Sequence, residues 1–235
     1  MATGIAGTKQ HDSPAGVFVA IWAREVFVVE LCFLAGSSGF GSCTSRSRYT
    51  GRMAEPATGG LLSVEEYLEF ERNSPVKHEY VGGRVYAMAG VSRRHSRISG
   101  NIFAVLREAA RGGPCRVHQS DMQVRVPDGL FYYPDVVVAC GPEPEDPYLE
   151  DDPCLVVEVL SPTTASTDRR EKLLSYRKLP SLRTYLIVEQ EETLVERHFR
   201  DENDRWQTDV LEEGRFPVNC PPGAALTVAE IYEGL

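Results

Sequence analysis

The stretch CLVVEVLSP, residues 154–162, places one carboxylate, Glu158, in the middle of an apolar run. The aliphatic and β-branched residues around it are typical of a strand that is buried on both faces, and the Ser-Pro pair ends that strand. A buried carboxylate without a partner costs several kcal/mol, so it is normally paired, protonated or bound to a cation. The rest of the chain must therefore supply a partner for Glu158.

A second stretch, YYPDVVVA, residues 132–139, places Asp135 at the head of another β-branched run. We expect the two strands to lie side by side and to bring both carboxylates to one point. Two like charges at close range raise one pKa unless a cation lies between them, and oxygen ligands suit Mg²⁺. The alternative, which spacing leaves open, is that each acid caps a strand end or pairs with an arginine.

The stretch DRREKLLSYRKLP, residues 168–180, predicts a helix that begins at Asp168 and ends at Pro180. Asp168, Lys172 and Tyr176 share one face of this helix, so Lys172 can approach the two acids if the helix packs on the sheet. A lysine there can orient a water molecule and offset charge on a phosphate. The alternative is an ordinary Asp168–Lys172 surface pair.

The remaining patterns predict an α/β fold, with a mixed central β-sheet flanked by helices and an added antiparallel hairpin region near the C-terminus. Ser63 and Glu66 form a capping box, Gly82-Gly83 indicates a hairpin, and residues 92–113 indicate a helix. Further strands are expected from patterns in these ranges: 115–127, 131–140, 184–190, 194–200 and 205–211. Gln119, Asp121 and Gln123 alternate within 115–127 and would share one strand face.

Residues 1–60 differ from residues 61–235, which carry the regular patterns of one globular domain. The first segment is expected to be an unstructured extension or translated upstream sequence. Its apolar stretch at residues 16–36 is interrupted by Arg24, Glu25 and Glu30, so each apolar piece is too short to span a membrane.

The formal net charge of −9 argues against a protein that coats nucleic acid by bulk electrostatics. Six cysteines include no CxxC pair, and Cys115 with His118 gives a single half-site. Zinc is therefore not expected, and free thiols in a reducing cytoplasm are the simpler interpretation.

Several motifs resemble the Uma-two family of restriction endonucleases, within the PD-(D/E)XK nuclease superfamily. The resemblance is carried by these segments: YYPDVVVA, LVVEVLSPTT, DRREKLLSYRKLP, SVEEYLEF, KHEYVGGRVYAMAG, RHSRISGNI, SDMQVRV and AEIYEGL. It implies a restriction-endonuclease-like fold and Mg²⁺-dependent hydrolysis of phosphodiester bonds in DNA, with Mn²⁺ as a substitute. It also implies a homodimer as one option, since many such nucleases cut two strands as dimers.

The resemblance also implies roles for single residues. Asp135 corresponds to the Pro-Asp acid and Glu158 to the acid of the Glu-x-Lys pair, but Leu160 stands where the lysine belongs, so Lys172 is its replacement. Glu79 matches an early acidic position and is a further metal or water ligand, or a solvent-exposed hairpin acid.

We therefore expect Asp135, Glu158 and the carbonyl of Val159 to hold one Mg²⁺, while Lys172 orients the attacking water. His95 also matches a family position, either as a satisfied histidine or as a general base. The arginines expected to contact the DNA backbone are Arg93, Arg94 and Arg97. Two alternatives stay open: an inactive nucleic-acid-binding module on the same fold, and a structural or interaction protein whose acids only form ion pairs.

Overall fold

The computed structural model describes residues 59–161 and 165–235. All of them belong to one compact unit. An extension is predicted for residues 1–60, and residues 1–58 of it lie outside the described residues.

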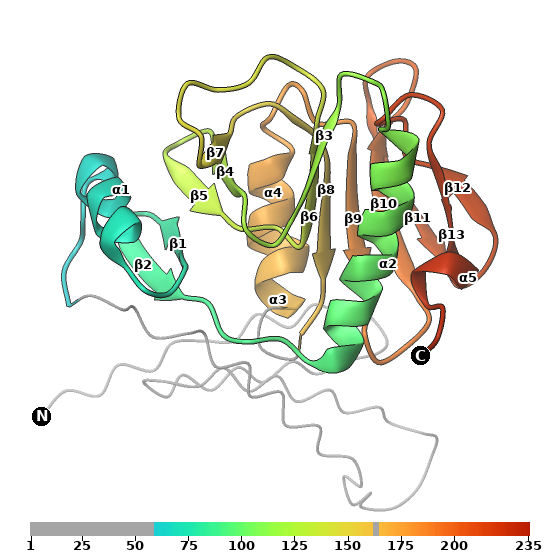
Figure 1. Ribbon diagram of the computed structural model, residues 1–235, viewed down its shortest axis with the longest axis horizontal. Coiled ribbons are helices and arrows are strands. Elements are labelled where there is room, and N and C mark those ends of the chain that lie inside the picture. Colours follow the sequence, from blue (N-terminus) through green and yellow to red (C-terminus); the bar gives the residue numbers. More distant parts are fainter. Residues whose placement is uncertain (1–58, 162–164) are drawn as a thin grey trace, which may run out of the picture. The chain divides into compact units, whose positions relative to one another are not determined.

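A six-stranded mixed sheet forms the centre of the described residues (Figure 1). Its strands follow in the spatial order β11 (Trp206–Leu211), β10 (Val195–Arg200), β9 (Thr184–Val188), β8 (Pro153–Val159), β6 (Val136–Ala139) and β3 (Arg116–Gln119). Only the β8–β9 pair is parallel, and the other neighbours are antiparallel. The predicted mixed sheet with an antiparallel addition is confirmed.

A second sheet of five strands and a two-stranded hairpin complete the β-structure. The second sheet has the order β2 (Arg84–Ala87), β1 (His78–Val81), β5 (Leu130–Tyr132), β4 (Gln123–Val126) and β7 (Leu149–Glu150). The hairpin joins β12 (Arg215–Pro217) to β13 (Ala225–Thr227).

Helices cover both faces of the six-stranded sheet. The helical segments are α1 (Val64–Asn73), α2 (Arg93–Ala109), α3 (Ala165–Thr167), a π-helical turn (Asp168–Lys172), α4 (Leu173–Tyr176) and α5 (Val228–Ile231). On one face, Ile98 and Ile102 of α2 pack on alternate strand residues such as Val157. On the other face, Tyr176 of α4 packs on Val156. The sheet is therefore buried on both sides, which explains the nearly continuous apolar run of β8.

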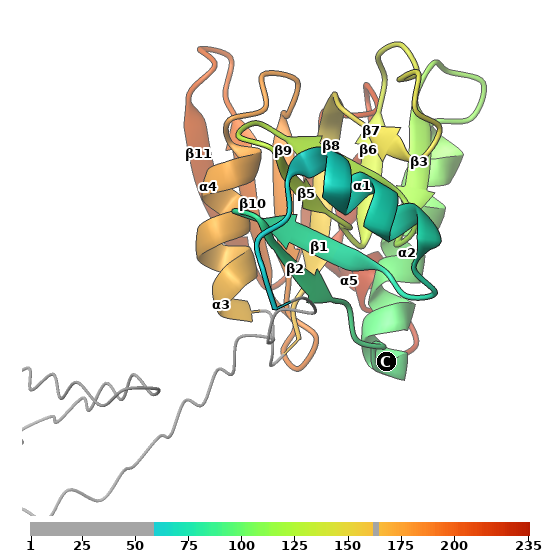
Figure 2. The same cartoon turned by 90° about the vertical axis from the view of Figure 1, so that its left-hand side faces the viewer.

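Helix α1 packs on the five-stranded sheet, and Figure 2 shows it beside β1 and β2. Its N-terminus carries the predicted capping box: the Glu66 N–H donates to Ser63 Oγ at 3.2 Å, and the Ser63 N–H donates to Glu66 Oε2 at 2.7 Å. These two bonds satisfy backbone donors that a helix start leaves unpaired, so the prediction is confirmed.

The single strand expected over residues 115–127 is wrong. Ser120 adopts a positive φ of 60°, and the chain leaves β3 in the six-stranded sheet to enter β4 in the five-stranded sheet. Gln119, Asp121 and Gln123 therefore do not share one strand face, because they lie on β3, in the connection and on β4.

The helix expected from Asp168 to Pro180 differs in both position and form. Helical structure already begins at Ala165, passes through the π-helical turn and ends at Tyr176. A π-helical turn holds one more residue than an α-helical turn.

The expectation of free thiols is also wrong for four cysteines. The structure pairs Cys115 with Cys140 and Cys154 with Cys220. Arg116 pairs with Ala139 across β3 and β6, so the next residues outward, Cys115 and Cys140, stand opposite each other. The spacing along the chain contained no sign of this cross-strand meeting.

Candidate active site

Asp135 and Glu158 meet where β6 begins and β8 ends. Val136 pairs with Val157 in the antiparallel ladder, so one step further along this register Asp135 lies opposite Glu158. The Val159 N–H donates to Asp135 Oδ2 at 2.7 Å, which fixes the aspartate against β8. The predicted side-by-side placement of the two strands is therefore confirmed, and the negative charge of Asp135 is among those that raise the pKa of Glu158.

Lys172 lies at the centre of three carboxylates. Its Nζ is 2.8 Å from Glu79 Oε1, 3.0 Å from Glu158 Oε1 and 3.2 Å from Asp168 Oδ1. These acids come from different parts of the fold, namely β1, β8 and the π-helical turn. Lys172 thus brings together residues that are far apart in the sequence.

The three contacts are not equivalent. Only Glu158 accepts a hydrogen bond from the ammonium, whereas Glu79 Oε1 and Asp168 Oδ1 are buried oxygens that accept none from the described residues. The Tyr176 hydroxyl donates a second, longer hydrogen bond of 3.3 Å to Glu158 Oε1. The Glu79 and Asp168 oxygens are nevertheless ion-paired with the ammonium, so three mostly buried carboxylates share one cation and the site favours an additional proton or cation.

Burial raises the pKa of Glu158 well above its usual range, the nearby Lys172 offsets part of this, and Asp168, Asp135 and Glu79 raise it further. For Lys172, burial lowers the pKa, but the charges of Glu158, Glu79 and Asp168 outweigh this and leave the pKa raised. The lysine is therefore held as an ammonium ion, which can orient a ligand or balance charge but does not act as a base.

Asp168 has a larger part in this site than the sequence suggested. Its side chain is 2% exposed, so the interpretation of Asp168 and Lys172 as an ordinary surface pair is wrong. Its backbone carbonyl accepts a hydrogen bond of 3.1 Å from the Tyr185 hydroxyl. The spacing of four residues from Lys172 was the available signal, but it could not reveal the burial.

His95, at the start of α2, contacts the free oxygen of the aspartate. Its Nε2 is 2.8 Å from Asp135 Oδ1, and the ring is buried. Its Nδ1 is buried without a hydrogen-bond partner among the described residues. Of the two ring nitrogens of His95, only Nε2 thus has a hydrogen-bond partner among the described residues.

The family model for Uma2, described as putative restriction endonucleases, matches residues 64–229. The chain belongs to the Uma2 family. Two proteins of Synechocystis sp. (strain ATCC 27184 / PCC 6803 / Kazusa) are similar. The uncharacterized protein slr1290 is 37% identical over 74% of this chain and 93% of its own length, and the uncharacterized protein sll1609 is 31% identical over 63% and 86%.

The crystal structure of a putative nuclease of DUF820 from Anabaena variabilis ATCC 29413 has the same fold. It superposes with a TM-score of 0.62 at 17% sequence identity, over 73% of this chain and 97% of that chain. The Uma2 protein therefore has a restriction-endonuclease-like α/β fold. Among the described residues, none of the helices combines the length and the apolar character needed to cross a membrane.

In the Uma2 chain, Leu160 occupies the position where the nuclease pattern that the motifs resemble has a lysine. Leu160 is 2% exposed and packs in the apolar cluster around Tyr176, so a charge at that position would be buried in hydrocarbon. Lys172 reaches Glu158 from the following helix instead. Its Nζ thus lies beside the acid of the predicted Glu-x-Lys pair, and the migrated catalytic role stays a prediction.

The three arginines expected at the DNA backbone have different surroundings. The Arg94 guanidinium donates to the carbonyl of Gln190, and that of Arg97 donates to the carbonyl of Gly234. Arg93 is exposed and forms no ion pair within residues 59–161 and 165–235. Of the three arginines predicted to contact the DNA backbone, Arg93 is therefore available for such a contact. Arg94 and Arg97 hold α2 to neighbouring segments.

The donor set fits Mg²⁺ in its chemistry. Asp135, Glu158 and Glu79 offer carboxylate oxygens, which are the hard ligands this ion prefers, and Glu79 Oε1 accepts no hydrogen bond from the described residues. The carboxylate oxygens are not as close to one another as the ligands of one metal ion are, because the Lys172 ammonium lies between Glu79 and Glu158. In the part of the chain that the structure describes, ligand atoms that lie that close together are found at Cys140, Cys154 and Cys220.

Proposed function

We propose that this Uma2 protein is a Mg²⁺-dependent endonuclease that hydrolyses phosphodiester bonds of DNA. The observation that supports this best is the buried Lys172 ammonium in contact with Glu79, Glu158 and Asp168, beside Asp135. One ammonium leaves the surrounding acids with excess negative charge, which favours a divalent cation.

In this proposal, the ion would be held by Asp135, Glu158 and the Val159 carbonyl, with Glu79 as a further ligand. A divalent ion held by these residues would supply Lewis-acid chemistry, activating a water molecule and offsetting charge on the scissile phosphate. Lys172, kept protonated by its neighbours, orients the water and balances charge on the phosphate. His95 positions Asp135 through the 2.8 Å contact.

The arginines of α2 bind the DNA backbone without reading its sequence, as phosphate contacts do. Arg93 supplies the first such contact because it is exposed and not engaged in an ion pair among the described residues. A homodimer would allow both strands to be cut, and the mass of the assembly in solution with bound duplex tests this part of the proposal.

Cleavage of supercoiled and single-stranded DNA tests the chemistry. Asp135→Asn and Glu158→Gln each remove one charged ligand and are expected to lower Mg²⁺- or Mn²⁺-dependent cleavage more than about 100-fold. The matched controls are Asp151→Asn and Glu108→Gln, whose side chains form more exposed ion pairs with Arg125 and Arg111. Cleavage that persists in both site variants, or that survives a chelator, contradicts the proposal.

A second candidate function is a nucleic-acid-binding module without turnover. The observation in its favour is that Lys172 separates the carboxylates, which do not form a metal cage among the described residues. This candidate predicts DNA binding in gel-shift experiments with Mg²⁺ and no cleavage product. A third candidate, a structural or interaction protein, predicts no Mn²⁺ binding by calorimetry and no DNA binding.

A further inference from the structure

Four cysteines gather at the end of the six-stranded sheet that is remote from the candidate active site. Cys115 precedes β3, Cys140 follows β6, Cys154 lies in β8 and Cys220 lies between β12 and β13. Along β8, Cys154 is four residues from Glu158, or about 13 Å at the rise of a strand. The cysteines are thus a separate centre.

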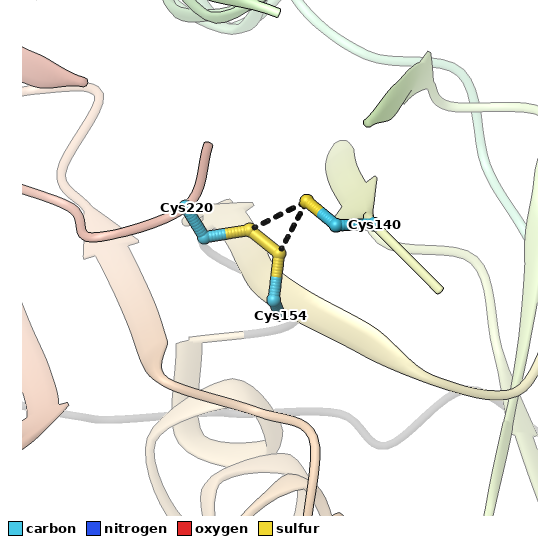
Figure 3. Close-up of side chains that lie close together, drawn as sticks. All are labelled: Cys140, Cys154 and Cys220. Carbon is cyan, nitrogen blue, oxygen red and sulfur yellow. Dashed lines mark hydrogen bonds between the residues drawn. A yellow bond between two sulfur atoms is a disulfide. The ribbon is translucent and has the colours of Figure 1, made fainter. Parts of the chain in front are cut away.

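The sulfur atoms of the two disulfides are in contact with each other. Cys140 Sγ lies 3.4 Å from Cys154 Sγ and 3.7 Å from Cys220 Sγ. Figure 3 draws these two contacts as dashed lines. These three sulfurs lie within 4.8 Å of one another. Tetrahedral zinc with a Zn–S distance of about 2.3 Å separates its sulfur ligands by roughly 3.8 Å. The two separations from Cys140 Sγ therefore match those of thiolates around one zinc ion, whereas Cys154 and Cys220 are bonded to each other in the disulfide and would have to separate on reduction.

The backbone holds these cysteines together without help from the sulfur bonds. The Arg116 guanidinium donates to the Gly141 carbonyl at 2.7 Å and so fixes the segment after Cys140. The Arg183 N–H donates to the Cys154 carbonyl at 2.9 Å. The Thr184 hydroxyl donates to the Val218 carbonyl at 2.8 Å, two residues before Cys220. Reduction of the disulfides would leave the thiols close together.

We propose that the reduced form of this centre binds one Zn²⁺ through the clustered Cys140, Cys154 and Cys220, with Cys115, the disulfide partner of Cys140, as the fourth ligand. Each disulfide takes two electrons and two protons from one dithiol and gives two thiols, while the dithiol becomes a disulfide. Binding of Zn²⁺ then releases the four thiol protons. The metal would join β3, β6, β8 and the segment between β12 and β13, in place of the two disulfides.

The two metal centres proposed here differ in ligand chemistry. Thiolates are soft ligands and select zinc, whereas the carboxylates at Glu158 suit Mg²⁺. The zinc proposal does not depend on nuclease activity, so its test needs no substrate.

The test uses the full chain, reduced with dithiothreitol, treated with a chelator and freed of both reagents under anaerobic conditions. One equivalent of Zn²⁺ per chain is expected to remain bound after gel filtration, measured by mass spectrometry of the metal. Co²⁺ is expected to give the thiolate charge-transfer bands and the visible bands of a tetrahedral site. A reduced chain that retains no Zn²⁺ overturns the proposal and identifies the centre as two disulfides only.

Variants assign the ligands. Cys154→Ser and Cys220→Ser are expected to lose the Co²⁺ charge-transfer bands and at least tenfold in zinc affinity. The matched controls are Cys32→Ser and Cys43→Ser, which are expected to keep both. Circular dichroism identifies variants that fail to fold, and for these the reduced unsubstituted chain alone decides the outcome. Unchanged Co²⁺ spectra in folded Cys154→Ser and Cys220→Ser contradict the assignment.

Discussion

Lys172 carries the positive charge that makes the candidate active site tolerable as a buried structure. Its side chain is 5% exposed, and the three carboxylates in contact with it are mostly buried as well. A buried ion pair has a small net effect on stability, but removal of one partner leaves the other charge uncompensated. The loss of Lys172 should therefore reduce stability as well as activity.

Lys172→Met is expected to lower the free energy of unfolding by about 3–5 kcal/mol, because it leaves buried acids without their cation. Lys178→Met is the matched control: Lys178 pairs with Asp128, and both side chains are at least half exposed. Loss of this ion pair should lower the free energy of unfolding by less than about 1 kcal/mol. Urea unfolding of both variants measures the difference, and equal effects would contradict this account of Lys172.

Glu158 predicts a dependence of stability on pH. Because its pKa is raised in the folded protein, the native state binds more protons than the unfolded state above the ordinary carboxyl value of 4.5. The stability of the wild type relative to Glu158→Gln should therefore fall as the pH rises from that value towards the raised pKa. Unfolding free energies of both proteins between pH 5 and about 8 check this, and parallel profiles would refute it.

The first turn of α2 is the element that holds His95 against Asp135. Ser92 caps this helix: its Oγ accepts from the His95 N–H at 3.0 Å and donates to Gln190 Oε1 at 2.8 Å. The cap fixes the helix start relative to β9 and the turn after it. The Ser92 cap thus affects the candidate active site by fixing the position of His95.

Ser92→Ala is expected to lower the free energy of unfolding by about 1 kcal/mol and to reduce DNA cleavage as well. Ser63→Ala removes the capping box of α1 and should cost about the same stability with cleavage unchanged. Chemical unfolding and cleavage rates of the two variants separate these effects. Equal cleavage rates would show that the cap of α2 has no positioning role.

Local signals were sufficient to predict many elements. The Ser63 and Glu66 pair located the start of α1, and Gly82-Gly83 located the β1–β2 hairpin. The break at Ser120 could not be predicted, because it depends on which of two sheets each half of the segment joins. Such a choice is made by contacts with distant strands, which a local pattern does not contain.

At the scale of the whole molecule, the site exists only when both sheets and the helical segment are assembled. Glu79 lies on the five-stranded sheet, Glu158 on the six-stranded sheet and Lys172 in the π-helical turn. The sequence predicted that Lys172 approaches Glu158, since both lie in adjacent elements of the chain. The contact of Glu79 with Lys172 joins separate sheets, and only the resemblance to the family pointed to Glu79.

Binding of Mg²⁺ to the native state alone would stabilise the whole fold. At a free Mg²⁺ concentration of 100 times Kd, the free energy of unfolding is expected to rise by about 2.7 kcal/mol. Asp135→Asn should abolish this increase, which thermal unfolding with and without Mg²⁺ measures. An equal increase in Asp135→Asn would place the bound ion elsewhere.

The π-helical turn at Asp168–Lys172 has a genetic consequence. Each residue rotates an α-helix by about 100°, and side chains three or four residues apart share a helix face, so loss of one codon between Asp168 and Lys172 would restore a regular helix and change the spacing of this pair from four residues to three. The shortened helix would keep its apolar contacts through Tyr176. One in-frame deletion would thus change the geometry of this buried ion pair while the fold persists, and an insertion at the same place would restore it.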